Sequence, residues 1–252
     1  MVLAFIFILG LVCGSFLDVL ANRLPRGKSV VEGRSQCDHC KHTLQPLDLI
    51  PLVSFLWLRG RCRYCRKPIG WECPLIELLT AMVFAITYLL LPFDPSLLYA
   101  LFIVSCLIII VVTDIKYGLI LNKITYTAII VSLIFLLLFS PLSFFNHLFA
   151  GIGGGLFFLL LFLITRGKGM GLGDVKFAFL MGLVMGYPSV VLAFYIAFLT
   201  GAIIASILII YHRKKARRAT IPFGPFLAIG TLVSLWGGER LVNYIVQILL
   251  YR

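Results

Sequence analysis

Long apolar runs separated by short polar segments dominate this chain. Crossing the hydrocarbon core of a bilayer takes about 20 apolar residues. Eight runs approach or reach that length, near Val2–Ala21, Leu75–Pro92, Leu97–Thr113, Ile124–Ser140, His147–Thr165, Val175–Pro188, Val190–Tyr211 and Ile221–Gly237. The pattern predicts an all-α polytopic membrane protein with about eight transmembrane helices. A ninth stretch, Leu241–Tyr251, is too short to span, so it is either the end of the last span or a helix in the membrane interface.

Composition supports the same class of protein. Of the 252 residues, 61% are hydrophobic and 13% are charged, and the mean hydropathy is +1.07. Soluble domains carry roughly 25% charged residues. The first run has no basic start, and it ends in Asp18, Asn22 and Arg23 where a cleaved signal would have small residues. We therefore expect it to be retained as the first transmembrane helix, residues 1–21.

Lys and Arg residues are distributed unevenly between the loops. If the eight spans alternate in direction, one side of the membrane carries loops 22–74, 114–123, 166–174 and 212–220. Every Lys and Arg except Arg240 and Arg252 lies in these loops or, for Lys176, at the edge of one. An excess of Lys and Arg marks the cytoplasmic side. The net charge of +12 is thus mainly a topology signal. The basic run 213–218 suits anionic lipid headgroups, and we predict no nucleic-acid partner.

Two aspartates stand at the cytoplasmic ends of predicted spans. Asp114 ends one apolar run, and Asp174 begins another two crossings later. A carboxylate at such a depth is costly and needs a partner, and here each is the plausible partner of the other. Two carboxyls in one site can activate water by acid–base chemistry. The alternative without a function is that Asp114 and Asp174 are ordinary solvated residues at helix ends. The helix dipole favours an Asp at a helix start, which suits Asp174, but it disfavours one at a helix end, which is where Asp114 lies.

Glycines alternate through the loop before Asp174. Of these, Gly171 and Gly173 flank Leu172 directly before the aspartate. Glycine permits positive φ and close approach of another backbone. We expect Gly171 and Gly173 to form a substrate-positioning loop, in which an extended peptide passes over Gly173. A phosphate-binding loop is excluded, because no Gly-Lys-Ser/Thr follows and the acid would repel phosphate.

The one soluble segment, residues 22–74, carries two Cys-x-x-Cys pairs. Four thiolates at this spacing predict a structural zinc site, with ligands Cys37, Cys40, Cys62 and Cys65. A module of this size usually needs a metal or disulfides to fold, and disulfides rarely persist in the cytoplasm. The thioredoxin-like βαβ pattern that a redox reading requires is missing. His39 and His42 are spare ligands, and Cys73 is a possible spare thiol.

With these motifs in view, nearly the whole chain resembles the type IV prepilin peptidases, membrane aspartyl proteases of the Gly-x-Gly-Asp type. The resemblance is carried by the segments Gly14–Val19, Arg23–Gly27, the cysteine pairs, Cys73–Leu78, Asp114, Gly171–Lys176 and Ile221–Ala228. In two departures, Asp18 stands where many members have Asn, and Asn122 stands where many have a Pro-Asp pair. Neither touches Asp114 or Asp174.

The resemblance implies a function. Asp114 and Asp174 would be catalytic, and the enzyme would cut the basic leader from type IV prepilins and pseudopilins at the cytoplasmic face of the bacterial inner membrane. Family members are often bifunctional and also methylate the new N-terminus with S-adenosylmethionine, for which the sequence shows no recognisable binding motif. Residues 22–74 would form the cytoplasmic zinc-binding module and 75–252 the transmembrane protease core. Glu77 would either hold the basic leader or, more simply, stabilise a helix start.

Two other classes of protein stay open at this stage. A transporter or proton relay would also use intramembrane acids, but it predicts acids deeper in the spans than the sequence shows. A non-catalytic zinc-ribbon scaffold for pilus or secretion assembly would explain the cysteines and leave the aspartates without a role. Replacing Asp114 by Asn separates the possibilities, because a scaffold should tolerate the change and a protease should not.

Overall fold

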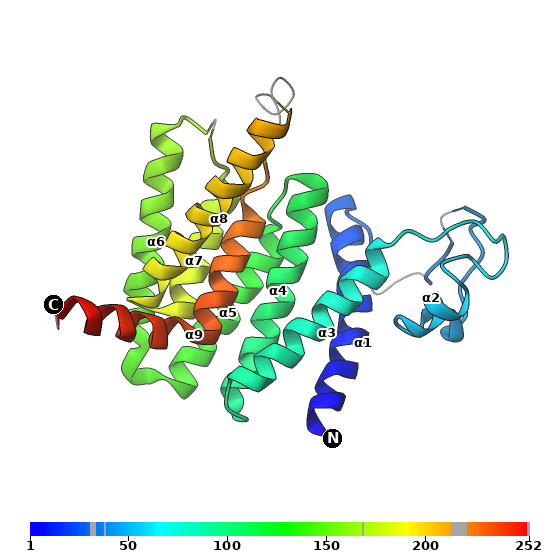
Figure 1. The fold of residues 1–252 in the computed structure, drawn as a ribbon, viewed down its shortest axis with the longest axis horizontal. Coiled ribbons are helices and arrows are strands. Elements are labelled where there is room, and N and C mark those ends of the chain that lie inside the picture. Colours follow the sequence, from blue (N-terminus) through cyan, green and yellow to red (C-terminus); the bar gives the residue numbers. More distant parts are fainter. Residues whose placement is uncertain (31–33, 38, 168, 213–220, 251–252) are drawn as a thin grey trace. The chain divides into compact units, whose positions relative to one another are not determined.

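The structure is a computed structural model that describes residues 1–30, 34–37, 39–167, 169–212 and 221–250. The basic run 213–218 lies outside the described residues. The helices are α1 Val2–Arg23, α2 Val53–Trp57, α3 Glu72–Leu90, α4 Pro95–Tyr117, α5 Asn122–Phe139, α6 Phe144–Ile164, α7 Leu172–Met185, α8 Ser189–His212 and α9 Gly224–Leu250, with short 3₁₀ turns at Leu24–Arg26, Pro46–Leu49 and Pro141–Ser143 (Figure 1). In these parts of the chain the only β pairing is two isolated bridges. The predicted all-α membrane fold is confirmed.

Within the described ranges, six helices are long and apolar enough to cross a membrane. They are α1, with the short turn after it, α3, α4, α5, α6, with the short turn before it, and α8. The other two predicted spans are shorter. Helix α7 has 14 residues, or about 21 Å at 1.5 Å per residue, which is less than the roughly 30 Å hydrocarbon core. Its side chains are largely buried, including Phe177, Leu180 and Met181, so protein and not lipid surrounds it. In the last span the apolar part is Gly224–Gly238.

The stretch from Leu241 onward continues α9 without a break as far as Leu250. In Figure 1 this red part of the helix runs in a different direction from the orange beginning of α9. The predicted ninth stretch is therefore the end of the last helix, directed away from its first part.

Contacts divide the chain into two units, Met1–Val112 and Thr113–Arg252, with the boundary inside α4. The three functional segments expected from the sequence stay a prediction. In the first unit α1 packs closely on α3. A Cβ at Gly10 would lie 2.6 Å from the Cα of Ala81, and one at Gly14 would lie 2.7 Å from the Cα of Glu77. Small residues four apart on one helix face let two membrane helices approach closely.

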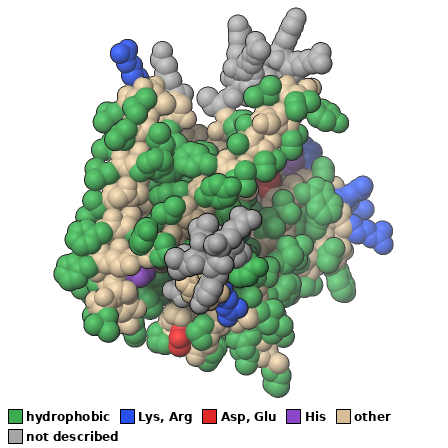
Figure 2. Space-filling view, turned by 60° about the vertical axis from the view of Figure 1, so that its left-hand side comes forward, with side chains coloured by type: hydrophobic (Ala, Val, Ile, Leu, Met, Phe, Trp, Pro, Cys, Tyr) green, Lys and Arg blue, Asp and Glu red, His purple; other side chains and the backbone are tan. Residues whose placement is uncertain are grey.

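The second unit is also built on close helix contacts. A Cβ at Gly182 of α7 would collide with the carbonyl group of Ala150 in α6, and one at Gly230 of α9 would collide with the carbonyl oxygen of Ala193 in α8. The face turned forward in Figure 2 is covered mostly by hydrophobic side chains, with few charged groups among them. A surface of this kind suits a lipid environment.

Candidate aspartate site and cysteine cluster

Asp114 lies in the last turn of α4, in the second unit, with 7% of its surface exposed. Its Oδ2 accepts a hydrogen bond of 2.8 Å from the backbone N–H of Gly224, the first residue of α9. The first N–H groups of a helix have no partner inside the helix, and they carry its positive dipole end. Asp114 is therefore at the unfavourable end of its own helix but at the favourable end of another, which the sequence did not reveal.

Gly224 is the functional residue that sequence reasoning missed. A Cβ at this position would lie 2.6 Å from Asp114 Oδ2, so a side chain cannot be added without moving the carboxyl group. The two residues are 110 positions apart. The motif Pro222-Phe223-Gly224-Pro225 could have pointed to Gly224. In the sequence this motif supported only the family resemblance.

Asp174 lies in the first turn of α7, with 8% of its surface exposed. Its Oδ2 accepts a hydrogen bond of 2.9 Å from the N–H of Gly171. Asp114 and Asp174 are close enough for the charge of the first to act on the second. Among the described residues, the hydrogen bonds to both side chains go to Oδ2, which leaves each Oδ1 for water or substrate. The structure thus places the two predicted residues in one region of the second unit.

The surroundings of the two glycines before Asp174 differ from each other. A Cβ at Gly173 would lie 2.9 Å from the Cβ of Ile120, in the segment that follows α4, whereas a Cβ at Gly171 would meet only Asp174 Oδ2 at an ordinary 3.6 Å. Neither residue has positive φ; in this loop Gly167 does, with φ of 70°. Gly173 therefore allows the start of α7 to pack on the segment after α4. Passage of a substrate over Gly173 stays a prediction.

Asn122, which stands where many relatives are expected to have an acid, has a structural partner. Its Oδ1 accepts a hydrogen bond of 2.8 Å from Lys176 Nζ, and the same ammonium lies 5.3 Å from the centre of the Tyr126 ring. This contact joins the start of α5 to the first turns of α7, beside Asp174.

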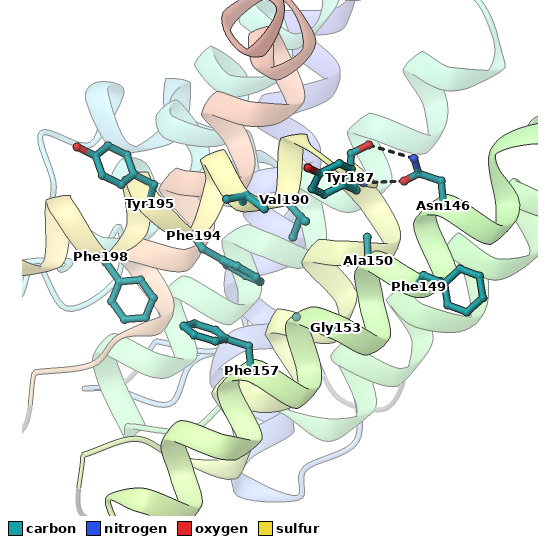
Figure 3. A pocket seen from close by; sticks show the side chains of 12 residues that line it. Asn146, Phe149, Ala150, Gly153, Phe157, Tyr187, Val190, Phe194, Tyr195 and Phe198 are labelled. Carbon is teal, nitrogen blue, oxygen red and sulfur yellow. Dashed lines mark hydrogen bonds between the residues drawn. The ribbon is translucent and has the colours of Figure 1, made fainter. Parts of the chain in front are cut away.

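An apolar cavity of about 700 Å³ lies between α6 and α8 (Figure 3). At one end Asn146 binds the backbone of Tyr187, through a bond from the Tyr187 N–H to Oδ1 and a bond from Nδ2 to the Tyr187 carbonyl oxygen. At the other end lies Phe198, whose ring centre is 5.4 Å from that of Phe223. Phe223 directly precedes Gly224. The contact between Phe198 and Phe223 therefore connects the lining of the cavity to the residue whose N–H binds Asp114.

The four predicted zinc ligands form a second site. The Sγ atoms of Cys37, Cys40, Cys62 and Cys65 all lie within 4.8 Å of one another, and those of Cys37 and Cys65 are 3.8 Å apart. Four thiolates at 2.3 Å from a central zinc define a tetrahedron with edges of about 3.8 Å. Backbone hydrogen bonds from Cys40 and His39 lower the pKa of the Cys37 thiol to about 6. The residues present therefore fit a structural metal ion.

Two matching turns build the cysteine cluster. Lys41 and Arg66 adopt positive φ of 57° and 54°, and their N–H groups donate to the carbonyl oxygens of Cys37 and Cys62. These turns bring the two cysteines of each pair together. The ring of His42 packs against that of Tyr64, with ring centres 3.7 Å apart and planes tilted by 39°.

The fold and the aspartate site together define the class: a polytopic α-helical membrane protein with a carboxyl pair suited to hydrolysis. Two protein-family models identify the class of protein more closely. Residues 8–91 match the bacterial peptidase A24 N-terminal domain, and residues 101–206 match the type IV leader peptidase family. The second match contains both aspartates, and the first contains all four clustered cysteines.

Curated relatives agree with the family models. The chain is 35% identical to the prepilin leader peptidase/N-methyltransferase of Bacillus subtilis (strain 168), over 98% of this chain and 99% of the relative. Proteins of the same name from Aeromonas hydrophila and Burkholderia pseudomallei (strain 1026b) are 31% and 32% identical, over 97% and 94% of this chain and 94% and 86% of the relatives. No solved structure matches the chain significantly. The chain belongs to the type IV prepilin leader peptidase family.

Proposed function

We propose that this protein removes the basic leader from type IV prepilins and pseudopilins, with Asp114 and Asp174 as its catalytic pair. Membership of the family supports leader cleavage. The observation that carries the assignment of the residues is their arrangement: two largely buried carboxyls in one region of the second unit, each held by a glycine N–H at a helix start.

The pair performs acid–base chemistry on water. Like charges in one site cannot both ionise at low cost, so one aspartate is protonated while the other is ionised. The ionised carboxylate takes a proton from water as that water attacks the scissile carbonyl carbon. The protonated carboxyl donates to the carbonyl oxygen or to the leaving amine. These roles belong to the pair as a unit. The glycine N–H groups fix the direction of both carboxyls before substrate arrives.

The test is replacement of each aspartate by asparagine, which keeps the shape and an oxygen acceptor for the glycine N–H. Because general acid–base catalysis contributes about 10²- to 10⁴-fold, Asp114→Asn and Asp174→Asn should each lose at least that much cleavage. The readout is the mass of a co-reconstituted prepilin. Asp94→Asn is the matched control, since Asp94 is exposed and caps the start of α4 through Ser96. Normal processing by either site variant would exclude the two aspartates as the catalytic pair.

We further propose that the metal is zinc and that the aspartates face the cytoplasm. The donor set of four thiolates favours zinc over cations that prefer oxygen ligands. The orientation rests on the distribution of Lys and Arg between loops. Labelling of cysteines introduced into the loops, from either side of sealed cells, would test the orientation.

Methylation of the new N-terminus by S-adenosylmethionine is proposed from the names of the relatives alone. The two cavities described in the cysteine module do not fit this cofactor. Arg59, Arg61, Arg63 and Arg66 line one of them, where a sulfonium cation would meet four guanidinium groups, and no acidic side chain lines the other. The mass of the mature substrate, with or without one added methyl group, tests the activity.

A further inference from the structure

Helix α2 of the cysteine module presents an unpartnered apolar face. Val53, Leu56 and Trp57 lie at helical spacings of three and four, so they share one side of the helix. Leu56 is 71% exposed and Trp57 is 83% exposed. Exposed apolar side chains that share one face indicate an interaction surface. We call Val53, Leu56 and Trp57 the α2 apolar face.

A buried carboxyl group fixes the depth of α2 relative to the membrane helices. Glu77 is only 4% exposed, and its Oε2 accepts a hydrogen bond of 2.8 Å from the N–H of Leu52, directly before α2. Its Oε1 accepts from the thiol of Cys73. Both oxygens are occupied by the protein itself, so this contact, and not a leader peptide, is what Glu77 binds in the structure.

Glu77 lies five residues after Glu72, the start of α3, which is about 7.5 Å along the helix. The start of α2 is thus held beside α3 at a level past the start of α3, on the way toward the membrane. Figure 1 shows α2 beside the α1–α3 pair and not above its end. The headgroup region of each leaflet is several ångströms thick, so this level suits a position of α2 among the lipid headgroups.

Arginines lie beside Trp57, at one end of the α2 apolar face. Trp57 shares a cavity of about 570 Å³ with Arg59, Arg61, Arg63 and Arg66. Arg63 is paired with Asp48, with Nε 2.8 Å from Oδ1. No ion pair to the other three arginines occurs among the residues that the structure describes. Tryptophan beside arginine is the combination that anchors proteins in an interface, where the ring meets apolar chains and the guanidinium meets phosphate.

We propose that the α2 apolar face and the arginines Arg59, Arg61 and Arg66 dock the cysteine module onto the anionic surface of the membrane that α1 and α3 span. Charge selects this occupant. A basic leader peptide would be repelled by the arginines, and so would the same face of a second copy of the chain. Anionic headgroups complement the arginines, and acyl chains complement Leu56 and Trp57. This docking is independent of the catalytic roles of the aspartates.

The test uses the full-length protein in lipid nanodiscs, with Trp57 as the only tryptophan through Trp71→Phe and Trp236→Phe. Bromine atoms on the upper acyl chain quench a tryptophan that contacts them. We expect Trp57 emission to shift to shorter wavelength and to be quenched by brominated lipid, more strongly as the fraction of anionic lipid rises. Zinc content equal to that of the wild type verifies that the module is folded.

Charge variants test the arginines. Arg59→Gln with Arg66→Gln should remove the dependence of quenching on anionic lipid. Lys28→Gln with Lys41→Gln removes the same charge from the same module and should leave that dependence intact. Emission at the wavelength of water-exposed tryptophan, unquenched in every lipid, would overturn the proposal. Equal quenching in zwitterionic and anionic lipid, or quenching only when prepilin is added, would overturn it as well.

Discussion

At the scale of single residues, the carboxyl of Asp114 meets the backbone of Gly224 with no room for a side chain between them. The contact ties the end of α4 to the start of α9. The carboxyl of Asp114 is held in one place, because a short hydrogen bond at a helix start restrains both its position and its direction.

Gly224→Ala should therefore lower leader cleavage by about a hundredfold, the cost of displacing a catalytic group by about 1 Å. The added Cβ would lie 2.6 Å from Asp114 Oδ2 and must push it away. Gly237→Ala in the same helix is the matched control, because a Cβ there has no neighbour within 4 Å. The measurement is the cleavage rate of a purified prepilin. Equal rates for both variants would show that the position of Asp114 is not critical.

Gly173 allows a second test, one that separates helix packing from substrate approach. Gly173→Ala places a Cβ 2.9 Å from Ile120, whereas Gly171→Ala finds ordinary space. Cleavage should fall clearly in the first variant and little in the second. Adding Ile120→Ala to Gly173→Ala should restore part of the activity if Ile120 is the obstacle. A double variant no more active than Gly173→Ala would instead favour the interpretation that substrate passes over Gly173.

At the scale of elements, glycine spacing sets how closely α1 and α3 approach. Gly10 and Gly14 lie four residues apart on α1, and each faces the backbone of α3. The hydroxyl of Thr80, a neighbour of Gly14, donates to the carbonyl oxygen of Ile76 in its own helix. The interface is thus held by close packing between backbones.

Gly14→Leu should destabilise the first unit by about 1–3 kcal/mol or more, the usual cost of overpacking. Thermal unfolding of the purified protein should move to lower temperature. Phe16→Leu, on an exposed face of the same helix, should leave the melting temperature nearly unchanged. A Gly14→Leu protein as stable as the wild type would contradict the close α1–α3 contact.

The sequence predicted the existence of the membrane helices better than their boundaries. Apolar runs identify helices because the signal is local, and six of the eight predicted spans are long enough to cross a membrane. The boundaries of α7 depend on what surrounds the helix, which is decided by residues distant in sequence such as those of α6. The expected span Val175–Pro188 therefore begins three residues earlier and ends three residues earlier, as Leu172–Met185.

At the scale of the whole molecule, the residues of the two candidate sites could be proposed from the sequence, but the distant contacts that hold them in place could not. Asp114 and Asp174 were predicted as a pair from their depth in the membrane, and the cysteines from their spacing. Two hydrogen bonds join distant parts of the chain. One runs from the Gly224 N–H to Asp114, and the other runs from the Leu52 N–H to Glu77. No local pattern reports such contacts, since they arise only when helices pack.

Removal of the metal should unfold the cysteine module before it affects leader cleavage directly. Purified protein should contain about one zinc per chain, because four thiolates complete a tetrahedral site. Cys37→Ser with Cys62→Ser should abolish zinc binding and lower protein levels, since loss of ligands unfolds a metal-dependent module. Elemental analysis and quantitative immunoblotting measure the two effects. A folded, active protein without metal would show that the cysteines serve another purpose.

The bond between Gly224 and Asp114 also links helix mobility to the reaction cycle. In the proposed mechanism each aspartate gains and loses a proton at every turnover, and an ionised oxygen accepts a much stronger hydrogen bond than a neutral one. The hydrogen bond from the Gly224 N–H therefore restrains the first turn of α9 more strongly while Asp114 is ionised than while Asp114 is protonated. The amide hydrogen of Gly224 becomes an intrinsic reporter of that charge, and its rate of exchange with solvent should change when a substrate analogue locks the pair in one protonation state.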